Sequence, residues 1–530
     1  MPPWSLLLTV AALATGCQRT VTFEYSTEDT GCDTTWYGDA DEDGYGGTRF
    51  TVTACEAPPG YVSNRDDCDD LEPNQNPSLE EICGDNIDND CSGEADEACI
   101  TDLNDGTAFY GTSTGEGGFA LAAGDFNGDG GEDIVIGTPS ATVLTPSDGG
   151  VALFFWPHDS DRDLSTADVP ILGEPDGRHV FGYTVSVPGD LDGDGLEDLI
   201  ITAPQAFNSS DTSTGAVALF YGESLVAAVE GAPLGIGSSD TLWYGAERRD
   251  YFGSSLSDTD VGGDVSIFIG ASGTGLDQGT VYLLYRGTLS AEIYGEDEGD
   301  RIGRIGRIAA GDFNGDGVAD VFIGAHQRSN DDGEVYACLG PVTGTQSAAD
   351  CDRIHGEGSG SLFGESVAPA GDIDGDGLED LWIAAPSYDG EHIDEGVVYL
   401  VTGDMKNSDL DGQNIADLTT TRLVGTDTRD KLGSTISRGE DINQDGFSDA
   451  LIGSIELGQL EQGVATLFYG PLSGTILSGT ADQIYTSVTE TDRAGEALAM
   501  LPEMGALLID TPESDKGTTN GGTAWLISHD

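Results

Sequence analysis

The stretch Gly311-Asp-Phe-Asn-Gly-Asp-Gly-Val-Ala-Asp320, with the apolar run Val321-Phe-Ile-Gly324 directly after it, decides the fold of this 530-residue chain because it recurs. Repetition at a regular period indicates one supersecondary unit that stacks on copies of itself. Four further copies, each followed by a short apolar run, lie at Gly124–Asp133, Gly189–Asp198, Gly371–Asp380 and Glu440–Asp449.

A second marker counts the repeats independently of the acidic stretch. A glycine followed by an alternating, β-rich segment occurs seven times, and the period over residues 107–530 is about 60 residues. Two of the units, Phe252–Ala271 and Ala494–Pro512, keep the strands but lose the acidic stretch. The seven glycines are Gly150, Gly215, Gly279, Gly333, Gly396, Gly463 and Gly522.

Short strands separated by Gly and Asp turns, without helical periodicity, predict an all-β fold. About sixty residues make one four-stranded sheet, and sheets that cannot bury both faces alone must stack on one another. Radial stacking gives a propeller, which leaves only short, protected edges. We therefore predict a seven-bladed β-propeller over residues 107–530, with a linear solenoid as the alternative.

The ends of the repeat region predict how the ring closes. A β-rich segment near a glycine, such as Ile171-Leu-Gly173, completes each of the first six units as an outer fourth strand. The seventh unit ends after its third strand, Thr523–Ser528, and Ala108-Phe-Tyr-Gly111 has no unit before it. Pairing these two segments would remove the exposed edges at both ends of the array.

The acidic stretches carry the chemistry of a cation site. Numbered from its first aspartate, each has Asp or Asn at positions 1, 3, 5 and 9 and Gly at position 6. Hard oxygen ligands at this spacing suit Ca²⁺, whereas the alternative is a set of Asx-rich turns without an ion. We predict five calcium ions and none in the third or seventh unit. The candidate ligands are Asp125, Asn127, Asp129, Asp133, Asp190, Asp192, Asp194, Asp198, Asp312, Asn314, Asp316, Asp320, Asp372, Asp374, Asp376, Asp380, Asp441, Asn443, Asp445 and Asp449.

These repeats resemble the FG-GAP repeats that form the propeller of integrin α chains and of many bacterial surface proteins. The resemblance covers about four-fifths of the chain, residues 107–530. It implies that the ions lie in loops on the rim and stiffen the blades, so that their role is structural.

Residues 32–99 form a different module, rich in Cys, Asp and Asn and poor in aliphatic residues. Disulfides must replace a hydrophobic core in so small a unit, although the pairing of its cysteines stays open. Carboxylates alternate at Asp39, Asp41 and Asp43 and again at Asp88 and Asp90, a pattern that suits one or two further calcium ions. The alternative is a disulfide-stapled spacer with solvated acids. The module's cysteines are Cys32, Cys55, Cys68, Cys83, Cys91 and Cys99, and two more, Cys338 and Cys351, follow in the propeller.

The module resembles a metal-binding motif found in myxobacterial and related surface proteins. The matching pieces are Trp36–Gly46, Pro59–Tyr61, Asp67–Asp70 and Ile87–Cys91. The resemblance implies a bound metal without identifying it.

The first residues predict export. An apolar run from Leu6 to Ala14 ends in small residues, and Leu13-Ala-Thr-Gly-Cys17 resembles a bacterial lipobox. We predict a lipoprotein signal peptide over residues 1–17, lipidation at Cys17 and a linker over residues 18–31. The protein would then lie at the outer membrane or cell surface and touch the membrane only through its lipid anchor. An ordinary signal peptide with an incidental cysteine is the alternative.

Charge and motifs limit the function classes. With 96 acidic and 20 basic residues the formal net charge is −76, which repels nucleic acid and attracts cations. Adaptation to salt, or solubility alone, accounts for scattered acids but not for acids at fixed spacing. Neither an HExxH motif nor a GxSxG elbow occurs, so we predict no enzyme and no catalytic residues. We expect an adhesion or ligand-binding module for an extracellular protein or glycan. The alternatives are a structural or calcium-storing envelope protein and a hydrolase with a propeller active site.

Overall fold

The structure of the protein is a computed structural model, and the chain divides into two compact units, residues 1–80 with 88–95 and residues 81–87 with 96–530. The signal peptide, the linker and Cys17 lie outside the described residues, as do Cys32, Cys83 and Cys99. No helix among the residues described is both long and apolar enough to span a bilayer. The described residues are 34–41, 43–73, 75–79, 87–92, 100–111, 120–139, 149–173, 180–210, 212–229, 233–328, 332–403, 410–455, 463–487, 492–514, 516 and 521–528.

The first unit contains one small antiparallel sheet with the strand order β2-β1-β3. The strands are β1 (Thr35–Gly38), β2 (Gly47–Thr53) and β3 (Tyr61–Val62). Its large apolar side chains are poorly covered, and Phe50 is 52% exposed. A disulfide between Cys68 and Cys91 fastens the loops instead, as expected for a unit with too little apolar surface for a core.

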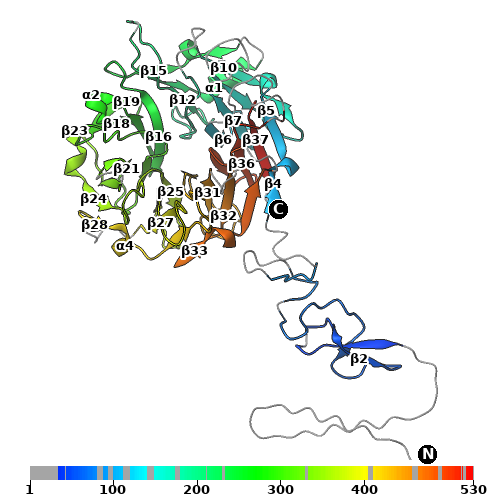
Figure 1. Cartoon of the computed structure of the whole chain (residues 1–530). Coiled ribbons are helices and arrows are strands. Elements are labelled where there is room, and N and C mark those ends of the chain that lie inside the picture. Colours follow the sequence, from blue (N-terminus) through cyan, green and yellow to red (C-terminus); the bar gives the residue numbers. More distant parts are fainter. Residues whose placement is uncertain are drawn as a thin grey trace, which may run out of the picture. The chain divides into compact units, whose positions relative to one another are not determined.

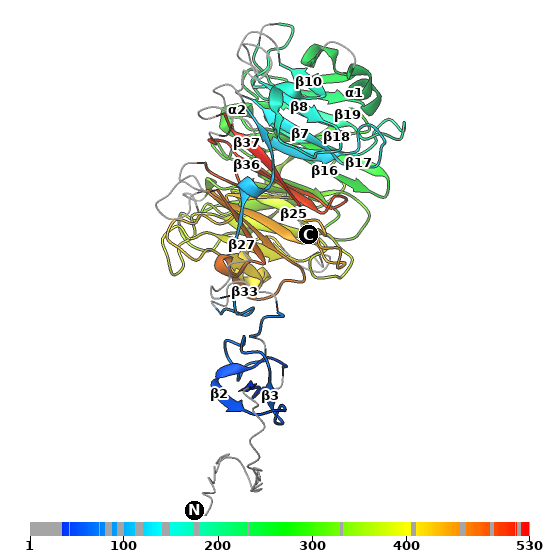
Figure 2. The ribbon, with the colours of Figure 1, turned by 90° about the vertical axis from the view of Figure 1, so that its right-hand side faces the viewer.

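The second unit is a ring of seven sheets, each with four antiparallel strands that start from an inner strand, which confirms the predicted seven-bladed propeller. Figure 1 views the propeller down the axis of the ring, and Figure 2 shows it from the side. Blade 1 contains β6 (Ala120–Gly124), β7 (Asp133–Thr138), β8 (Gly150–Phe154) and β10 (Val169–Leu172). Blade 2 contains β11 (Val185–Ser186), β12 (Leu199–Ala203), β13 (Ala216–Phe220) and β15 (Thr241–Tyr244). Blade 3 contains β16 (Phe252–Val261), β17 (Asp264–Ala271), β18 (Thr280–Tyr285) and β19 (Thr288–Tyr294).

The remaining blades repeat the same order of strands. Blade 4 contains β20 (Ile308–Gly311), β21 (Asp320–Ala325), β22 (Glu334–Cys338) and β24 (Asp352–His355). Blade 5 contains β25 (Val367–Gly371), β26 (Asp380–Ala385), β27 (Val397–Val401) and β29 (Arg422–Val424). Blade 6 contains β30 (Thr435–Ile436), β31 (Ala450–Ser454), β32 (Val464–Phe468) and β34 (Gln483–Thr486). Short helices α1 (Gly222–Ala228) and α2 (Thr274–Asp277) lie in loops of blades 2 and 3.

Blade 7 closes the ring with a strand from the N-terminal side, as predicted. Its first three strands are β35 (Leu498–Leu501), β36 (Ala506–Thr511) and β37 (Thr523–Ser528). The fourth is β5 (Thr107–Tyr110), which pairs antiparallel with β37 so that Ala108 faces Trp525 and Phe109 faces Ala524. Figure 1 shows the two strands side by side, although they lie at opposite ends of the repeat region.

Six blades gain a fifth, outer strand that the sequence analysis did not predict. Each fifth strand belongs in sequence to the next blade, where it lies between the third and fourth strands. It pairs parallel with the outer, fourth strand of the blade before. Blade 2 has no fifth strand, because β18 and β19 of blade 3 are joined by the tight turn at Arg286-Gly287. The propeller also begins before residue 107, since the strand at residues 100–102 belongs to blade 6. The fifth strands are β4 (Ile100–Asp102), β9 (Arg162–Asp163), β14 (Leu234–Gly235), β23 (Gly344–Ser347), β28 (Gln413–Asn414) and β33 (Thr475–Leu477).

Each fifth strand is followed by one helical turn whose first residue is buried, such as Leu103 or Ile415. These turns are η2 (Leu103–Asp105), η3 (Leu164–Thr166), η4 (Ile236–Ser238), η5 (Ala348–Asp350), α4 (Ile415–Leu418) and η7 (Ser478–Thr480). In blade 4 a disulfide between Cys338 and Cys351 joins the third strand to the end of this turn.

The core lies between the blades. Every residue of the second strands β7, β12 and β21 is buried, which explains why these runs are apolar throughout rather than alternating. One cluster joins Val135 of blade 1 to Leu199 of blade 2, so each sheet buries its faces against its neighbours.

The long hairpin of blade 3 reaches across the middle of the ring. Ser186 of blade 2 donates a hydrogen bond to the carboxylate of Asp258, and Arg438 of blade 6 donates one to the Asp258 carbonyl at 3.2 Å. Burial raises the pKa of Asp258, and the Arg438 charge opposes that shift.

Candidate metal sites

The five acidic stretches are the loops that connect the first and second strands of blades 1, 2, 4, 5 and 6. They share one end of the propeller, which we call the acidic rim. Loops between second and third strands, and loops that lead to the next blade, lie at the other end, the opposite rim. Blades 3 and 7 have tight turns in this place, at Gly262-Gly263 and at residues 502–505.

The carboxylate of the aspartate at position 1 accepts hydrogen bonds from backbone N–H groups of its own loop and so shapes the loop. In blade 1, Oδ1 of Asp125 accepts hydrogen bonds from Gly128 N at 2.7 Å and Asp129 N at 3.1 Å, and Oδ2 accepts one from Gly130 N at 2.9 Å. Gly130, at position 6, has φ of 86°, a conformation that side chains disfavour. Position 1 accepts from position 6 in all five loops, through Asp125, Asp190, Asp312, Asp372 and Asp441.

Position 9 fastens the loop to the sheet. Asp133 is fully buried, and its two oxygens accept hydrogen bonds from Phe126 N at 3.1 Å and Trp156 N at 2.8 Å. The first bond closes the loop and the second ties it to the segment after the third strand. Burial raises the pKa of this carboxyl to about 7 in Asp133, Asp320 and Asp380, and to about 6 in Asp198 and Asp449.

In two of the five loops, three carboxylates bring their oxygens together as a calcium site requires. In blade 2, one oxygen each from Asp190, Asp192 and Asp194 lies within 4.8 Å of the others, and in blade 5 the same holds for Asp372, Asp374 and Asp380. In blade 4, Oδ2 of Asp320 is buried without a hydrogen-bond partner among the described residues. A hard divalent cation would compensate such an oxygen, so the residues fit Ca²⁺. Position 3 is an amide in three loops, at Asn127, Asn314 and Asn443.

In four of the five loops, the side chain at position 8 links the loop to the blade before it, a role that the sequence analysis missed. Glu197 of blade 2 accepts a hydrogen bond from Asp125 N of the blade 1 loop at 2.7 Å. Glu132 of blade 1 accepts one from Met504 N of blade 7 at 3.0 Å. Glu379 and Ser448 accept equivalent bonds from Asp312 N and Asp372 N.

Blade 4 is the exception, because it has Ala319 at position 8 and so offers no side-chain oxygen to accept such a bond. The recurrence of glutamate at position 8 in three of the five loops was the available signal in the sequence.

The N-terminal unit holds a second kind of acidic site. Oxygens of Asp39, Asp41 and Asp43 lie within 4.8 Å of one another. Asp70 Oδ1 accepts a hydrogen bond from Ala40 N at 3.1 Å, which places this carboxylate beside the same turn. Burial raises the pKa of Asp67 to about 6, and Asp43, Asp41 and Asp70 add to that shift.

Asp67 and Asp70 therefore lie near the turn whose three aspartates, Asp39, Asp41 and Asp43, bring their oxygens together. Each of the five has one buried oxygen without a hydrogen-bond partner in the described part of the chain, namely Asp39 Oδ1, Asp41 Oδ2, Asp43 Oδ2, Asp67 Oδ2 and Asp70 Oδ2. Such a group is costly unless a cation binds, and an all-oxygen donor set favours Ca²⁺ over softer metals. The sequence analysis did not predict Asp67 and Asp70 as candidate ligands, because side chains about thirty residues apart meet only in the fold.

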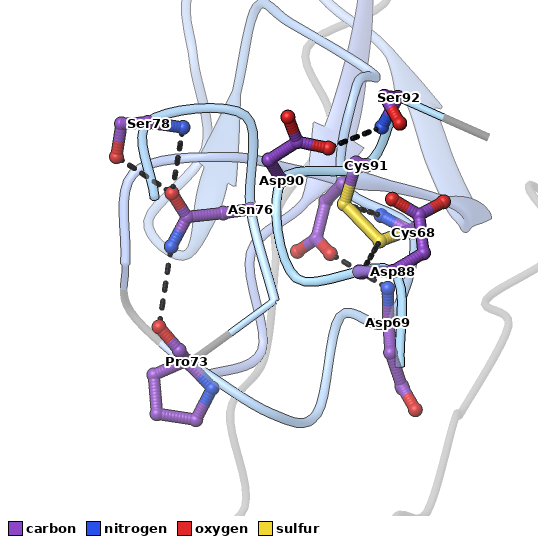
Figure 3. Close-up of a disulfide and its surroundings, with 10 residues drawn as sticks. Cys68, Asp69, Pro73, Asn76, Ser78, Asp88, Asp90, Cys91 and Ser92 are labelled. Carbon is purple, nitrogen blue, oxygen red and sulfur yellow. Dashed lines mark hydrogen bonds between the residues drawn. A yellow bond between two sulfur atoms is a disulfide. The ribbon is translucent and has the colours of Figure 1, made fainter. Parts of the chain in front are cut away.

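The two other predicted ligands of this unit lie in a loop closed by the disulfide. Asp90 Oδ1 accepts a hydrogen bond from Ser92 N at 2.9 Å, and Cys68 Sγ lies 3.4 Å from the Asp88 carbonyl oxygen (Figure 3). No described group of three clustered metal-binding side chains includes Asp88 or Asp90. The disulfide between Cys68 and Cys91 joins this loop to the segment that carries Asp67 and Asp70.

Two of the described histidines, His158 and His326, are buried in the packing of the blades. His158 packs edge-on against Phe109 at 5.6 Å between ring centroids, and its Nε2 lies 3.2 Å from the Glu132 carbonyl. His326 Nε2 lies 3.3 Å from Glu365, and burial lowers its pKa to about 3.

Two known families match segments in the two parts of the chain. The family described as "FG-GAP repeat" matches residues 117–154, 181–220, 306–338 and 363–401. The family described as "Putative metal-binding motif" matches residues 67–97. The chain thus carries an FG-GAP repeat domain similar to that of integrin α chains, together with a metal-binding motif.

Curated relatives support the likeness to integrins. Integrin alpha-4 of Xenopus laevis is 31% identical over 183 residues, which is 33% of this chain and 17% of the relative. Integrin alpha-V of Gallus gallus is 25% identical over 276 residues, or 52% of this chain and 20% of the relative. The chain spans about a fifth or less of the length of these relatives. Among solved structures, "Structure of Dos1 propeller" matches with a TM-score of 0.37 and 10% identity, over 79% of this chain and 94% of that one.

Proposed function

We propose that this chain is an exported calcium-binding surface protein whose propeller serves as an adhesion or ligand-binding module. The observation that carries the proposal is the set of five acidic loops, preorganised on one rim of a propeller similar to that of integrin α chains. Such a ring offers large rim surfaces for a ligand, while the ions stiffen the blades. The alternative of a structural or calcium-storing protein shares the loops but needs no ligand.

Calcium is proposed as the cofactor, with one ion in each of the five propeller loops and one in the N-terminal unit. When free calcium is tenfold above the dissociation constant, each site stabilises the fold by about 1.4 kcal/mol. Isothermal titration of calcium-free protein should give six sites, and EGTA should lower the melting temperature. Titration without binding, or an unchanged melt in EGTA, would remove calcium from the proposal.

The anchor is proposed at Cys17, with the membrane reached only through attached lipid. Two or three acyl chains hold a protein firmly where one chain does not. The Cys17→Ser variant should appear in the culture medium, while the parent protein stays with the outer membrane. Retention of the variant in the membrane fraction would count against a lipid anchor.

The ligand is proposed to be an extracellular protein or glycan. The test is binding of the full chain to cells, matrix proteins and a glycan array, in calcium and in EGTA. Binding that calcium supports and EGTA abolishes favours the adhesion module. Calcium binding without any surface or glycan binding favours the structural alternative. Turnover of esterase or glycosidase substrates would instead indicate an enzyme.

A further inference from the structure

A small pocket lies on the opposite rim, where blade 2 meets blade 3. Its volume is about 420 Å³, within the size range of small-molecule sites. The walls come from the loop between the second and third strands of blade 2 and from the loop that leads into blade 3. The lining residues that matter here are Phe207, Thr212, Ser213, Arg248, Arg249 and Tyr251.

The two walls are held in place by backbone contacts. Phe207 and Ser213 form an isolated β-bridge that closes the first loop on itself. Arg249 N donates a hydrogen bond to the Ser213 carbonyl at 2.7 Å, which joins the second loop to the first. Asp250 is 1% exposed, and its carboxylate accepts a hydrogen bond from Glu247 N, which fixes the turn of the second loop. The pocket is therefore shaped before any ligand arrives.

The charge in the pocket is unusual for this chain. Arg248 and Arg249 are adjacent and exposed, and neither guanidinium has an ion-pair partner among the described residues. Of the eleven other described arginines of the propeller, nine pair with carboxylates, and Arg304 and Arg429 do not. In a chain of net charge −76, two neighbouring guanidiniums without an ion-pair partner in the described part of the chain can form a local site for an anion.

The other lining groups indicate which anion fits. Phe207 and Tyr251 are partly buried aromatic residues that can pack against the apolar face of a sugar ring. Thr212, Ser213 and Gln205 supply hydroxyl and amide groups that can bond sugar hydroxyls. A guanidinium binds a carboxylate through two parallel hydrogen bonds.

We propose that this pocket binds a carboxylate-bearing sugar of the uronic acid class, with Arg248 and Arg249 holding the carboxylate. The proposal rests on the proposed ligand-binding function and names the class of its ligand. The site lies away from the acidic loops, so calcium does not take part in the contact.

The probes are methyl β-glucuronide and methyl β-glucoside, which differ only by a carboxylate in place of a hydroxymethyl group. Binding to the calcium-loaded full chain is measured by ligand-observed NMR titration. We expect the glucuronide to bind and the glucoside to bind at least about tenfold more weakly, since a charge-assisted hydrogen bond is lost. Higher salt should weaken the binding of the glucuronide but not that of the glucoside. Equal binding of the two glycosides, or no binding of either, would overturn the proposal.

The variants Arg248→Ala and Arg249→Ala should each weaken glucuronide binding about tenfold or more. Arg429→Ala is the matched control, because Arg429 is exposed in the loop between blades 5 and 6 with φ of 67°, against 69° for Arg249. Arg249→Lys tests geometry, since lysine keeps the charge without the planar fork. Equal loss in Arg429→Ala, or no loss in the pocket variants, would overturn the assignment.

Two further arms separate the possible failures. In the first, an acidic tripeptide is titrated in place of the sugar. If the tripeptide binds and loses affinity in the two arginine variants, while the glucuronide does not bind, the ligand is a peptide and the proposal is overturned. Calcium-dependent adhesion that persists in Arg248→Ala and Arg249→Ala, when the parent protein also fails to bind glucuronide, would refute this pocket and leave the proposed function standing.

Discussion

Replacing Phe109 by alanine tests whether strand β5 closes the propeller. Phe109 is fully buried, and its ring lies 4.9 Å from that of Phe154 in blade 1, measured between centroids. Its strand pairs with β37 on one side and with β9 of blade 1 on the other. The residue therefore joins blade 7 to blade 1 although it lies outside the repeats in sequence.

The expected loss follows from the burial. Truncating a buried phenylalanine to alanine costs about 3–5 kcal/mol. A cooperative unit of about 420 residues unfolds with an entropy near 0.9 kcal/mol/K, so Phe109→Ala should lower the melting temperature by about 3–6 °C. The control is Phe50→Ala, because Phe50 is 52% exposed and lies outside the propeller. We expect the control to shift the melt by less than about 1 °C.

The assay is thermal unfolding in excess calcium, combined with amide hydrogen exchange. Loss of closure should raise exchange in β37 and in β9, on both sides of the altered strand. A second pair of variants separates closure from packing: removal of residues 1–99 should leave the melt of the propeller unchanged, while removal of residues 1–111 should lower it strongly. The reasoning is refuted if Phe109→Ala melts like the parent, or if both truncations melt alike.

Three other predictions follow from the acidic sites. Glu197→Ala should destabilise the calcium-loaded propeller by about 1–3 kcal/mol in chemical denaturation, because it leaves the Asp125 N–H without its acceptor, whereas Glu223→Ala on the exposed face of α1 should have no effect; equal effects would contradict a coupling role. In calcium-free protein the folded pKa of Asp133, Asp320 and Asp380 is about 7, above the unfolded value of about 3.9, so stability should rise as the pH falls from 8 through 7 towards 5. The rise in melting temperature caused by calcium should shrink over the same window, and a constant rise between pH 8 and 5.5 would speak against these protonations. Asp67→Asn should weaken Tb³⁺ luminescence from the N-terminal unit, whereas Asp69→Asn, at an exposed neighbour, should not; identical luminescence in the two variants would exclude Asp67 as a ligand.

The propeller could be predicted because its signals are local. The acidic stretches place glycine and carboxylates at fixed offsets, and the strands after them are apolar throughout, so each unit identifies itself. Ring closure through Ala108 to Gly111 was predictable because one strand was missing at one end and one was spare at the other. Both inferences used only the repeat pattern.

The features that sequence reasoning missed depend on contacts between distant segments. The fifth strands are two to four residues long, and Arg162-Asp163 carries no pattern that would indicate a strand. Asp67 and Asp70 join the site at Asp39 only because β1 and its neighbouring loops fold together. The pairing of Cys68 with Cys91 was one of many combinations that composition alone cannot rank.

The absence of a fifth strand from blade 2 gives the ring one distinct seam. Six of the junctions between blades are spanned by a parallel strand and a helical turn. At the junction between blades 2 and 3, the outer strand β15 pairs only with β13 of its own blade. Thermal motion should then concentrate at this seam, so that the distance between blades 2 and 3 varies more than the distance between any other two neighbouring blades. The hydrogen bond from Arg249 N to the Ser213 carbonyl joins the two loops that line the pocket across this junction, so it opposes that motion and keeps the two walls of the pocket together.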